Sequence, residues 1–257
     1  MDRLITATAR AERDHFWFRG FRAFVRPLLA QVAGNGRPLR VLDCGCGTGN
    51  NLTLLDPLGR AFGIDLTWSA LEFAREAGKS RIACASAARI PCADAAFDLV
   101  TAFDVFQCLA EEDERAAAAE IFRGLRPGGH ALLNVAAMNL LWGNHSILSH
   151  EVRRYSRRRL RRILEDAGLE VLRLTHTNAT LFPIVFLARL VQRTRGLPAS
   201  DDAESAASEI RIPPAPINGL LGTLLVLEAA VVRRVNLPFG SSLICLARKP
   251  LQPAVGR

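Results

Sequence analysis

The sequence has no hydrophobic run of the ~20 residues that a membrane-spanning helix needs. Its first residues also lack the apolar segment of a secretory signal. Cys44 and Cys46 have no second cysteine pair at the spacing of a zinc site, so we expect no bound metal. Six cysteines in mostly apolar contexts favour reduced, buried thiols and hence a cytoplasmic location. The 257 residues, 49% of them hydrophobic, are enough for one large folded unit with a sizeable core.

Two common nucleotide-binding signatures are missing from the glycine-rich loop VLDCGCGTGNN at residues 41–51. No Lys-Ser/Thr pair follows the loop, which excludes a P-loop. Gly45, Gly47 and Gly49 have the spacing G-x-G-x-G, whereas dinucleotide sites have G-x-G-x-x-G. The carboxylate of Asp43 would repel a pyrophosphate but attract an ammonium or sulfonium group. The loop therefore predicts a site for a cationic nucleoside, a description that S-adenosyl-L-methionine (SAM) fits.

Predicted strands and helices alternate along most of the chain, which is typical of a doubly wound parallel sheet. The expected strands cover residues 40–43, 61–65, 81–84, 97–103, 130–137, 169–175 and 241–248. The expected helices cover residues 50–55, 69–77 and 112–125, together with a helical segment over 10–32 that Gly20 interrupts. A further amphipathic helix begins after Ser156, which can cap it, and ends near Gly168.

Asp65 ends the second predicted strand, where its carboxylate can accept hydrogen bonds from both hydroxyls of a ribose. A lone aspartate at a strand end often caps a helix instead. Its combination with the glycine-rich loop favours ribose binding.

Four segments resemble the class I SAM-dependent methyltransferases and occur in the order expected for that family. They are VLDCGCGTGN, GIDLTWSALEFAR, ARIPCADAAFDLVTAFDVFQCL and LRPGGHALLNV, between residues 39 and 137. The resemblance implies an α/β fold, a Rossmann-like seven-stranded sheet whose last strand is antiparallel. It favours the small-molecule type, distantly like the quinone-biosynthesis methyltransferases. We expect an N-terminal helical cap (1–34), a SAM-binding core (35–178), a helical insertion or lid (179–240), and the last strand with a tail (241–257).

The resemblance also implies which residues bind SAM. Asp65 would hold the ribose and Leu66 would lie against the adenine. Ser86 stands where the family often has aspartate, and its hydroxyl accepts a hydrogen bond more weakly than a carboxylate. The complete expected cofactor site is Asp43, Gly45, Cys46, Gly47, Gly49 and Asn50 in the loop, Asp65, Leu66, Ser86, Ala87, Phe103 and Asp104.

The segment LLWGNHSILSHEVRRYS follows the fifth predicted strand and is rich in polar and aromatic residues. An oxygen or carbon acid loses a proton on methylation, and imidazole is the side chain best suited to take one up near pH 7. We therefore predict His145 or His150 as the catalytic base. Arg154 and Tyr155 are predicted to assist at the catalytic site, and Trp142 and Arg153 to contact the acceptor. The alternative is an ordinary polar loop whose histidines cap helices.

A second unusual segment, HFWFRGFR, lies near the N-terminus. With Glu12 before it, this segment resembles the opening of a group of bacterial methyltransferases, and the later HEVRRYS resembles another run of that group. We predict that His15, Trp17 and Arg19 contact the substrate. The alternative is that these residues form only the packing face of a helix.

The charge and the insertion bear on the methyl acceptor. The chain has a net charge of +8, and seven arginines lie between Arg153 and Arg162. Such a cluster suits a phosphate group or an anionic membrane, or is simply a solvated helix face. The two apolar stretches at 181–191 and 220–232, on either side of the polar stretch LPASDDAESAASE, suit a lid, a membrane contact or a dimer interface.

These observations predict a SAM-dependent methyltransferase that acts on a small, hydrophobic or lipid-like acceptor, with O-methylation favoured over C-methylation. The alternatives are a nucleic-acid methyltransferase that uses the arginine-rich helix, a SAM-binding protein without methyl transfer, and an NAD-dependent oxidoreductase. No Asn/Asp-Pro-Pro-Tyr/Phe tetrapeptide follows the fourth predicted strand, which argues against DNA or glutamine as the acceptor and leaves RNA open. The sequence leaves open a monomer or a homodimer, and a peripheral contact with a membrane.

Overall fold

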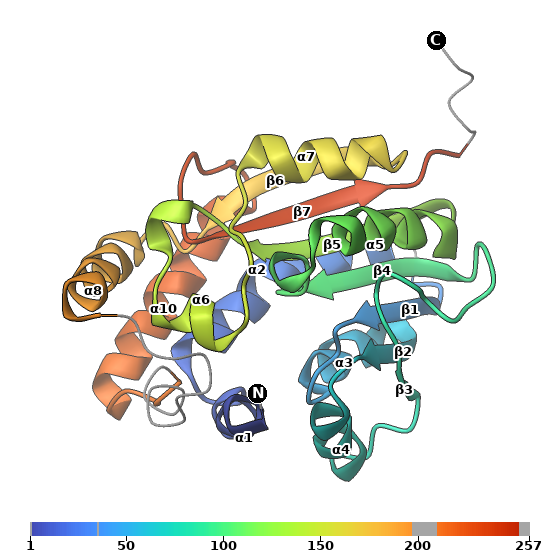
Figure 1. Cartoon of the computed structure of the whole chain (residues 1–257). Helices are drawn as coiled ribbons and strands as arrows, with labels where there is room; N and C mark the ends of the chain where they lie inside the picture. Colours follow the sequence, from blue (N-terminus) through green and yellow to red (C-terminus); the bar gives the residue numbers. More distant parts are fainter. Residues whose placement is uncertain (1, 35, 197–209, 252–257) are drawn as a thin grey trace.

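A mixed sheet of seven strands forms the centre of the protein (Figure 1). This computed structural model describes residues 2–34, 36–196 and 210–251. The strands follow the order β3-β2-β1-β4-β5-β7-β6, and β7 is antiparallel to both of its neighbours. They are β1 (Leu39–Cys44), β2 (Gly59–Asp65), β3 (Ile82–Cys84), β4 (Phe97–Phe103), β5 (Leu125–Ala136), β6 (Glu170–Thr177) and β7 (Ser242–Arg248). The predicted fold class is therefore confirmed.

Helices cover both faces of the sheet, and each face has its own hydrophobic core. On one face, α5 (Glu111–Gly124) and α7 (Arg157–Asp166) pack against the strands. On the other face, α2 (Phe16–Ala33) and α10 (Ala215–Val232) do so. Strand β4 is buried along its whole length because it lies between the two cores. The shorter elements are α1 (Asp2–Ala11), α3 (Asn50–Leu55), η1 (Asp56–Leu58), α4 (Trp68–Glu76), η2 (Phe106–Cys108), η3 (Asn139–Leu141), α6 (Asn144–Leu148) and α8 (Phe182–Arg195).

The N-terminal helical segment divides at a different place from the one predicted. We expected an interruption at Gly20, but the break between α1 and α2 falls at residues 12–15. His15 caps α2, because its ring Nδ1 accepts a hydrogen bond from the N–H of Trp17 at 3.1 Å. Gly20 lies inside the helix, where a Cβ atom would stand 2.4 Å from Leu225 Cδ1. The glycine is retained within a helix because it lets α2 and α10 approach closely.

The amphipathic helix predicted after Ser156 is present as α7. The Ser156 hydroxyl accepts a hydrogen bond from the N–H of Arg159 at 3.2 Å, as expected of an N-cap. Gly168 has a φ of +91°, which allows the chain to leave the end of the helix in a left-handed conformation. The capping residues read from the sequence are thus confirmed.

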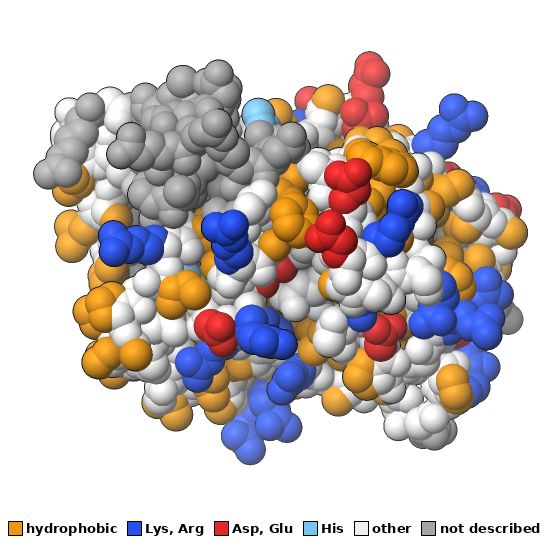
Figure 2. Space-filling model, turned by 90° about the horizontal axis from the view of Figure 1, so that it is seen from below, with side chains coloured by type: hydrophobic (Ala, Val, Ile, Leu, Met, Phe, Trp, Pro, Cys, Tyr) orange, Lys and Arg blue, Asp and Glu red, His pale blue; other side chains and the backbone are white. Residues whose placement is uncertain are grey.

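The two apolar stretches of the insertion form α8 and α10, and the polar stretch 197–209 lies outside the described residues. By length and composition alone, α10 could cross a membrane, and 28% of it is buried. However, its buried Glu228 accepts hydrogen bonds from the N–H groups of Ala179 and Thr180, which ties the helix to the end of β6. Figure 2 shows hydrophobic side chains on the side of the molecule formed by α8 and α10, at the left of that view.

Candidate active site

The glycine-rich loop follows β1 at the carboxyl edge of the sheet, and its backbone requires glycine. Gly45, Gly47 and Gly49 have φ values of +75°, +51° and +77°. A Cβ atom on Gly45 would stand 2.1 Å from the side chain of Val105, so this glycine lets the loop pack against the segment after β4. A Cβ atom on Gly47 would meet nothing within 4 Å. The backbone at Gly47 therefore faces open space in which a ligand can approach it.

Asp43 supplies a buried carboxyl group directly beneath this loop. Its Oδ1 accepts a hydrogen bond from the Thr101 hydroxyl at 2.6 Å, while Oδ2 has no partner among the described residues. Burial raises the pKa of Asp43 to about 7. A buried carboxyl oxygen without a donor is costly unless a ligand supplies one. The cationic nucleoside predicted from the sequence would do so.

Asp65 links the second strand to the loop. Its Oδ2 accepts a hydrogen bond from the N–H of Gly47 at 2.8 Å, and its Oδ1 accepts one from the N–H of Thr67 at 2.7 Å. Each carboxylate oxygen can accept a further hydrogen bond, so both remain able to bind a ribose hydroxyl. Next to Asp65, the side chain of Leu66 is 65% exposed and Trp68 is 56% exposed. These two side chains offer an open apolar surface for a purine ring.

The other residues predicted for this site divide between exposed and buried positions. The Ser86 hydroxyl accepts a hydrogen bond from the N–H of Ala88 at 3.1 Å and keeps its own proton to donate. Ala87 is buried in the core. Phe103 is also buried and packs edge-to-face against Phe21 of α2, with ring centres 5.0 Å apart. Phe103 therefore supports the edge of the sheet on which the site is built.

Asp104 follows β4 in a strained conformation, with a φ of +60°. Its Oδ1 accepts hydrogen bonds from Asn134 Nδ2 at 2.9 Å and Gln107 Nε2 at 3.2 Å. Asp104 is an exposed residue, although protein atoms surround its carboxyl. The surrounding protein raises the pKa of Asp104 to about 6. Gln107 and Asn134 were not predicted as site residues, although both lie within the segments that resemble the family.

A contact between Glu12 and Thr48 joins the N-terminal helices to the glycine-rich loop. The Thr48 hydroxyl donates a hydrogen bond to the Glu12 carboxylate at 2.6 Å, and Arg22 donates one to the Glu12 carbonyl oxygen at 2.8 Å. Burial raises the pKa of Glu12. The sequence analysis noted Glu12 only as part of a pattern, and that pattern was the available signal for this contact.

The comparisons with known proteins agree with this geometry. Residues 42–133 match the family model described as a methyltransferase domain. These residues contain the glycine-rich loop, Asp65 and Asp104. Residues 42–133 therefore form a methyltransferase domain, and this match supports the predicted class I SAM-dependent family. The enzyme's cofactor is therefore SAM, and its product is S-adenosyl-L-homocysteine.

Solved structures similar to this methyltransferase share its fold. A SAM-dependent methyltransferase from Archaeoglobus fulgidus is 16% identical, with a TM-score of 0.56, over 89% of this chain and 93% of that chain. The phosphoethanolamine N-methyltransferase 2 of Haemonchus contortus, in complex with SAM, is 16% identical, with a TM-score of 0.61, over 97% and 57% of the two chains. The cyclase SpnF is 22% identical, with a TM-score of 0.57, over 90% and 81%. No curated protein sequence matches the chain significantly.

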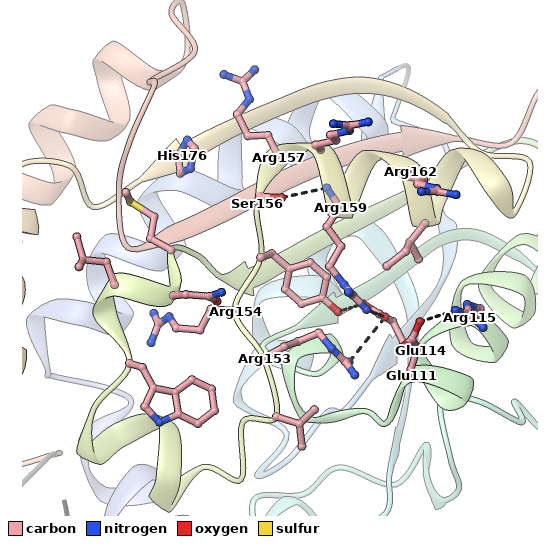
Figure 3. Close-up of a pocket in the computed structure, with 18 of the residues that line it drawn as sticks. Glu111, Glu114, Arg115, Arg153, Arg154, Ser156, Arg157, Arg159, Arg162 and His176 are labelled. Carbon is pink, nitrogen blue, oxygen red and sulfur yellow. Dashed lines mark hydrogen bonds and ion pairs between the residues drawn. The ribbon is translucent and has the colours of Figure 1, made fainter.

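In this methyltransferase, the predicted acceptor segment after β5 is held by a buried ionic network. Glu114 of α5 is fully buried, and the hydroxyl of Tyr155 donates a hydrogen bond to its carboxylate. Arg159 and Arg153 also pair with Glu114, as Figure 3 shows. Tyr155 itself is only 1% exposed. These contacts fix the segment to α5, and the role of Tyr155 in catalysis stays a prediction.

Arg154 is engaged in a similar way. Its guanidinium donates hydrogen bonds to the carbonyl oxygens of Ala137 at 2.9 Å and Ser241 at 3.2 Å. It also donates to the Ser146 hydroxyl at 3.1 Å and pairs with Glu151 at 3.3 Å. These bonds join the ends of β5 and β7 to the segment around α6. Direct contact of Arg154 with an acceptor therefore stays a prediction.

The two candidate bases lie on or next to α6. His145 is half-buried, and its Nε2 lies 3.3 Å from the Ser149 hydroxyl. His150 is exposed and has a φ of +53°. The turn around His150 is held against η2, because Cys108 Sγ lies 3.3 Å from the Ser149 carbonyl oxygen. Since η2 follows Asp104 directly, this contact brings the turn to the same edge of the sheet as the cofactor site.

The remaining predicted substrate residues lie in two separate places. His15 is buried and caps α2, while Trp17 is half-buried. Arg19 is exposed and lies beside Gly222 of α10. Trp142 and Arg153 line a groove on the other side of the segment after β5. The structure thus does not bring these residues into one cluster, and their contact with substrate stays a prediction.

Proposed function

We propose that this enzyme transfers the SAM methyl group to an oxygen atom of a small, hydrophobic acceptor. SAM supplies an electrophilic methyl group on a sulfonium. The protein then has to position the acceptor, exclude water and take up the proton of the acceptor oxygen.

One observation carries this proposal, namely the strained backbone at the carboxyl edge of the sheet. Among the described residues, five that are not glycine have a positive φ: Ala95, Asp104, Met138, His150 and Asn178. Three of these five follow β4, β5 or α6, and Asn178 follows the edge strand β6. Such strain costs about 1–3 kcal/mol per residue and tends to occur where function requires it. It supports placing the acceptor between the segments after β4 and β5.

His150 is the favoured base within this edge. It is exposed and sits in a strained turn, and its ring has no hydrogen-bond partner among the described residues. A free imidazole can take a proton from a hydroxyl as the methyl group is transferred. His145 is the second candidate, because its Nε2 already lies near the Ser149 hydroxyl.

The apolar character of nearby surfaces supports a hydrophobic acceptor. The side chains of Leu66 and Leu140 are 65% and 48% exposed, and Trp142 is half-buried. Exposed apolar patches beside a polar site are typical of sites for greasy ligands. C-methylation remains the second choice, since a carbon acid needs the same base.

The experiment uses SAM labelled on its methyl group, purified protein and an extract of the source cells. We expect label to move into the organic phase and S-adenosyl-L-homocysteine to form in equal amount. A His150→Gln variant should transfer methyl groups about 100-fold more slowly with unchanged SAM affinity. The matched control is His130→Gln, a residue within β5 that pairs with Leu99 of β4. Label confined to the aqueous phase, or on RNA, would overturn the hydrophobic acceptor, and normal turnover by both His145 and His150 variants would overturn the base assignment.

A further inference from the structure

An arginine-rich groove of about 1260 Å³ lies on the outer side of the segment after β5. Figure 3 shows its arrangement. Arg157, Arg158 and Arg162 of α7 form one side of the groove, and Leu140 and Trp142 contribute to its lining from the segment after β5. None of the residues predicted to bind SAM lines it. The groove is therefore separate from the cofactor site.

The arginines of the groove differ in how their charge is compensated. Arg153 and Arg159 turn toward the buried Glu114, whereas Arg157 and Arg162 point away from it (Figure 3). Arg157 donates a hydrogen bond only to the carbonyl oxygen of Leu174, at 3.0 Å, among the described residues.

The outer arginines of α7 keep most of their charge. Within the described part of the chain, the side chain of Arg158 is exposed and makes no hydrogen bond or ion pair. Arg162 pairs with Asp166 at 3.6 Å, but both side chains are more than two-thirds exposed, and such pairs are weak. The rim of the groove therefore carries positive charge that the described carboxylates neutralise only weakly, through the exposed pair of Arg162 with Asp166.

An apolar face of α8 adjoins this groove. Ile184, Leu187, Leu190 and Val191 are each between 46% and 59% exposed and recur at helical spacing on one side of α8. Hydrophobic side chains at such exposure are unusual for a helix that faces only water.

The two ends of α8 are joined to the walls of the groove. Near its C-terminal end, Arg193 donates hydrogen bonds to the carbonyl oxygens of Leu140 at 2.8 Å and Trp142 at 3.1 Å. At its N-terminal end, Phe182 packs edge-to-face on Phe239, whose neighbour Pro238 lines the groove. Helix α8 is thus held beside the groove, and the exposed apolar residues of α8 together with the outer arginines of α7 define the proposed docking surface.

We propose that this surface docks the enzyme on an anionic lipid bilayer. The phosphate groups of the lipids enter the groove beside Arg157, Arg158 and Arg162, while Leu187 and its neighbours on α8 enter the boundary between headgroups and acyl chains. Arginine near an anionic membrane and apolar side chains at the interface both favour binding. RNA would pair with the same arginines, but it would leave the apolar face of α8 in water.

Docking of this kind would bring the enzyme to a pool of hydrophobic acceptors. It concerns where the enzyme binds, and it holds whichever molecule receives the methyl group. The test therefore measures binding to lipid without turnover, so its failure is distinguishable from failure of the proposed reaction.

The full-length protein is floated with vesicles of phosphatidylcholine alone and with vesicles of phosphatidylcholine and phosphatidylglycerol in equal amounts. We expect binding to the second kind only, with an affinity that falls as salt is added. The double variant Arg158→Gln/Arg162→Gln should bind about fivefold more weakly per arginine removed. A control double variant, Arg26→Gln/Arg60→Gln, loses the same charge from exposed positions on α2 and β2 and should bind as the wild type does.

The apolar contribution is tested by Leu187→Gln, which should weaken vesicle binding about tenfold because one leucine no longer enters the interface. Its control is Leu251→Gln, a residue 73% exposed that lies beside Gly128 in the first half of β5. Equal binding to both kinds of vesicle, no binding to either, or equal loss in the test and control variants would overturn the proposal. Salt-dependent retention of RNA without vesicle binding would overturn it in favour of a nucleic-acid partner.

Discussion

The cofactor edge of the sheet and the segment after β5 are both rich in polar side chains, yet they use them differently. Asp43 keeps an unpaired buried oxygen, and Asp104 is an exposed residue. In the segment after β5, Tyr155 and Arg154 bond to groups of the protein itself. In the segment after β5, the dense run of polar residues therefore stabilises the fold. At the cofactor edge, by contrast, polar groups without a protein partner indicate a binding site for a ligand.

The largest effect expected from this comparison is on stability. Glu114→Ala removes the carboxylate that Tyr155, Arg153 and Arg159 share and leaves their polar groups without it. Breaking a buried ionic network of this kind costs about 3–5 kcal/mol of the free energy of unfolding. Urea unfolding at neutral pH measures the loss.

The matched control for Glu114→Ala is Glu112→Ala, an exposed glutamate on the same helix. The control should change the free energy of unfolding by less than about 0.5 kcal/mol. The contrary outcome is a Glu114→Ala variant that is as stable as the control but fails to transfer methyl groups. Glu114 and its partners would then belong to the reaction site, and their purely structural role would be wrong.

The next effect concerns the unpaired oxygen of Asp43. Asp43→Asn should weaken SAM binding by about 1.5–3 kcal/mol, the value for a hydrogen bond to a charged group. Because the pKa of Asp43 is raised to about 7, the wild-type carboxyl is protonated below that pH and loses its attraction for the cation. Wild-type affinity should therefore fall as the pH is lowered through 7. Calorimetric titrations at several pH values measure this.

The same substitution has an opposite effect on the ligand-free protein. Burial disfavours the ionised form of Asp43 in the folded state, so the wild type loses stability as the pH rises from the ordinary range of an aspartate toward 7. Asp43→Asn removes this penalty, and its melting temperature at pH 8 should exceed that of the wild type. A variant with unchanged affinity and unchanged pH dependence would show that Asp43 does not face the cofactor.

The sequence predicted the fold well because its signals are local. The run FDLVTAF at residues 97–103 is β4 with the same bounds, and Ser156 caps α7 as expected. The misplaced break in the N-terminal helix has a clear cause. Gly20 has a low helix propensity, but its reason for being there is Leu225, which is 205 residues away in the sequence.

The site was predicted less completely for the same physical reason. The glycine-rich loop, Asp43 and Asp65 are recognisable because the chemistry of the cofactor fixes their spacing. The bonds from Thr48 to Glu12 and from Tyr155 to Glu114 join distant parts of the chain. Nothing local in the sequence distinguishes Glu114 from the three acidic residues directly before it. Only the packing of the helices decides which carboxylate is buried.

A third, comparable effect tests the ribose assignment at the cofactor edge. Asp65→Ala should weaken SAM binding by about 1–3 kcal/mol, because both the ribose contacts and the hydrogen bond from the Gly47 N–H are lost. The control is Asp94→Ala. Asp94 is exposed and pairs with Arg123, and neither residue belongs to the glycine-rich loop. Equal SAM affinity of the Asp65 variant and the wild type would refute the assignment.

The smallest expected effect lies at the contact between the N-terminal helices and the cofactor loop. The hydrogen bond from the Thr48 hydroxyl to Glu12 holds the loop, so Glu12→Ala and Thr48→Val should each weaken SAM binding by about 0.5–1.5 kcal/mol. Because both variants remove the same bond, the double variant should be no weaker than either single one. Calorimetric titration of all four proteins gives the coupling energy. Additive losses would mean that Glu12 and Thr48 act separately, and that the cofactor edge depends on the N-terminal helices in some way other than this bond.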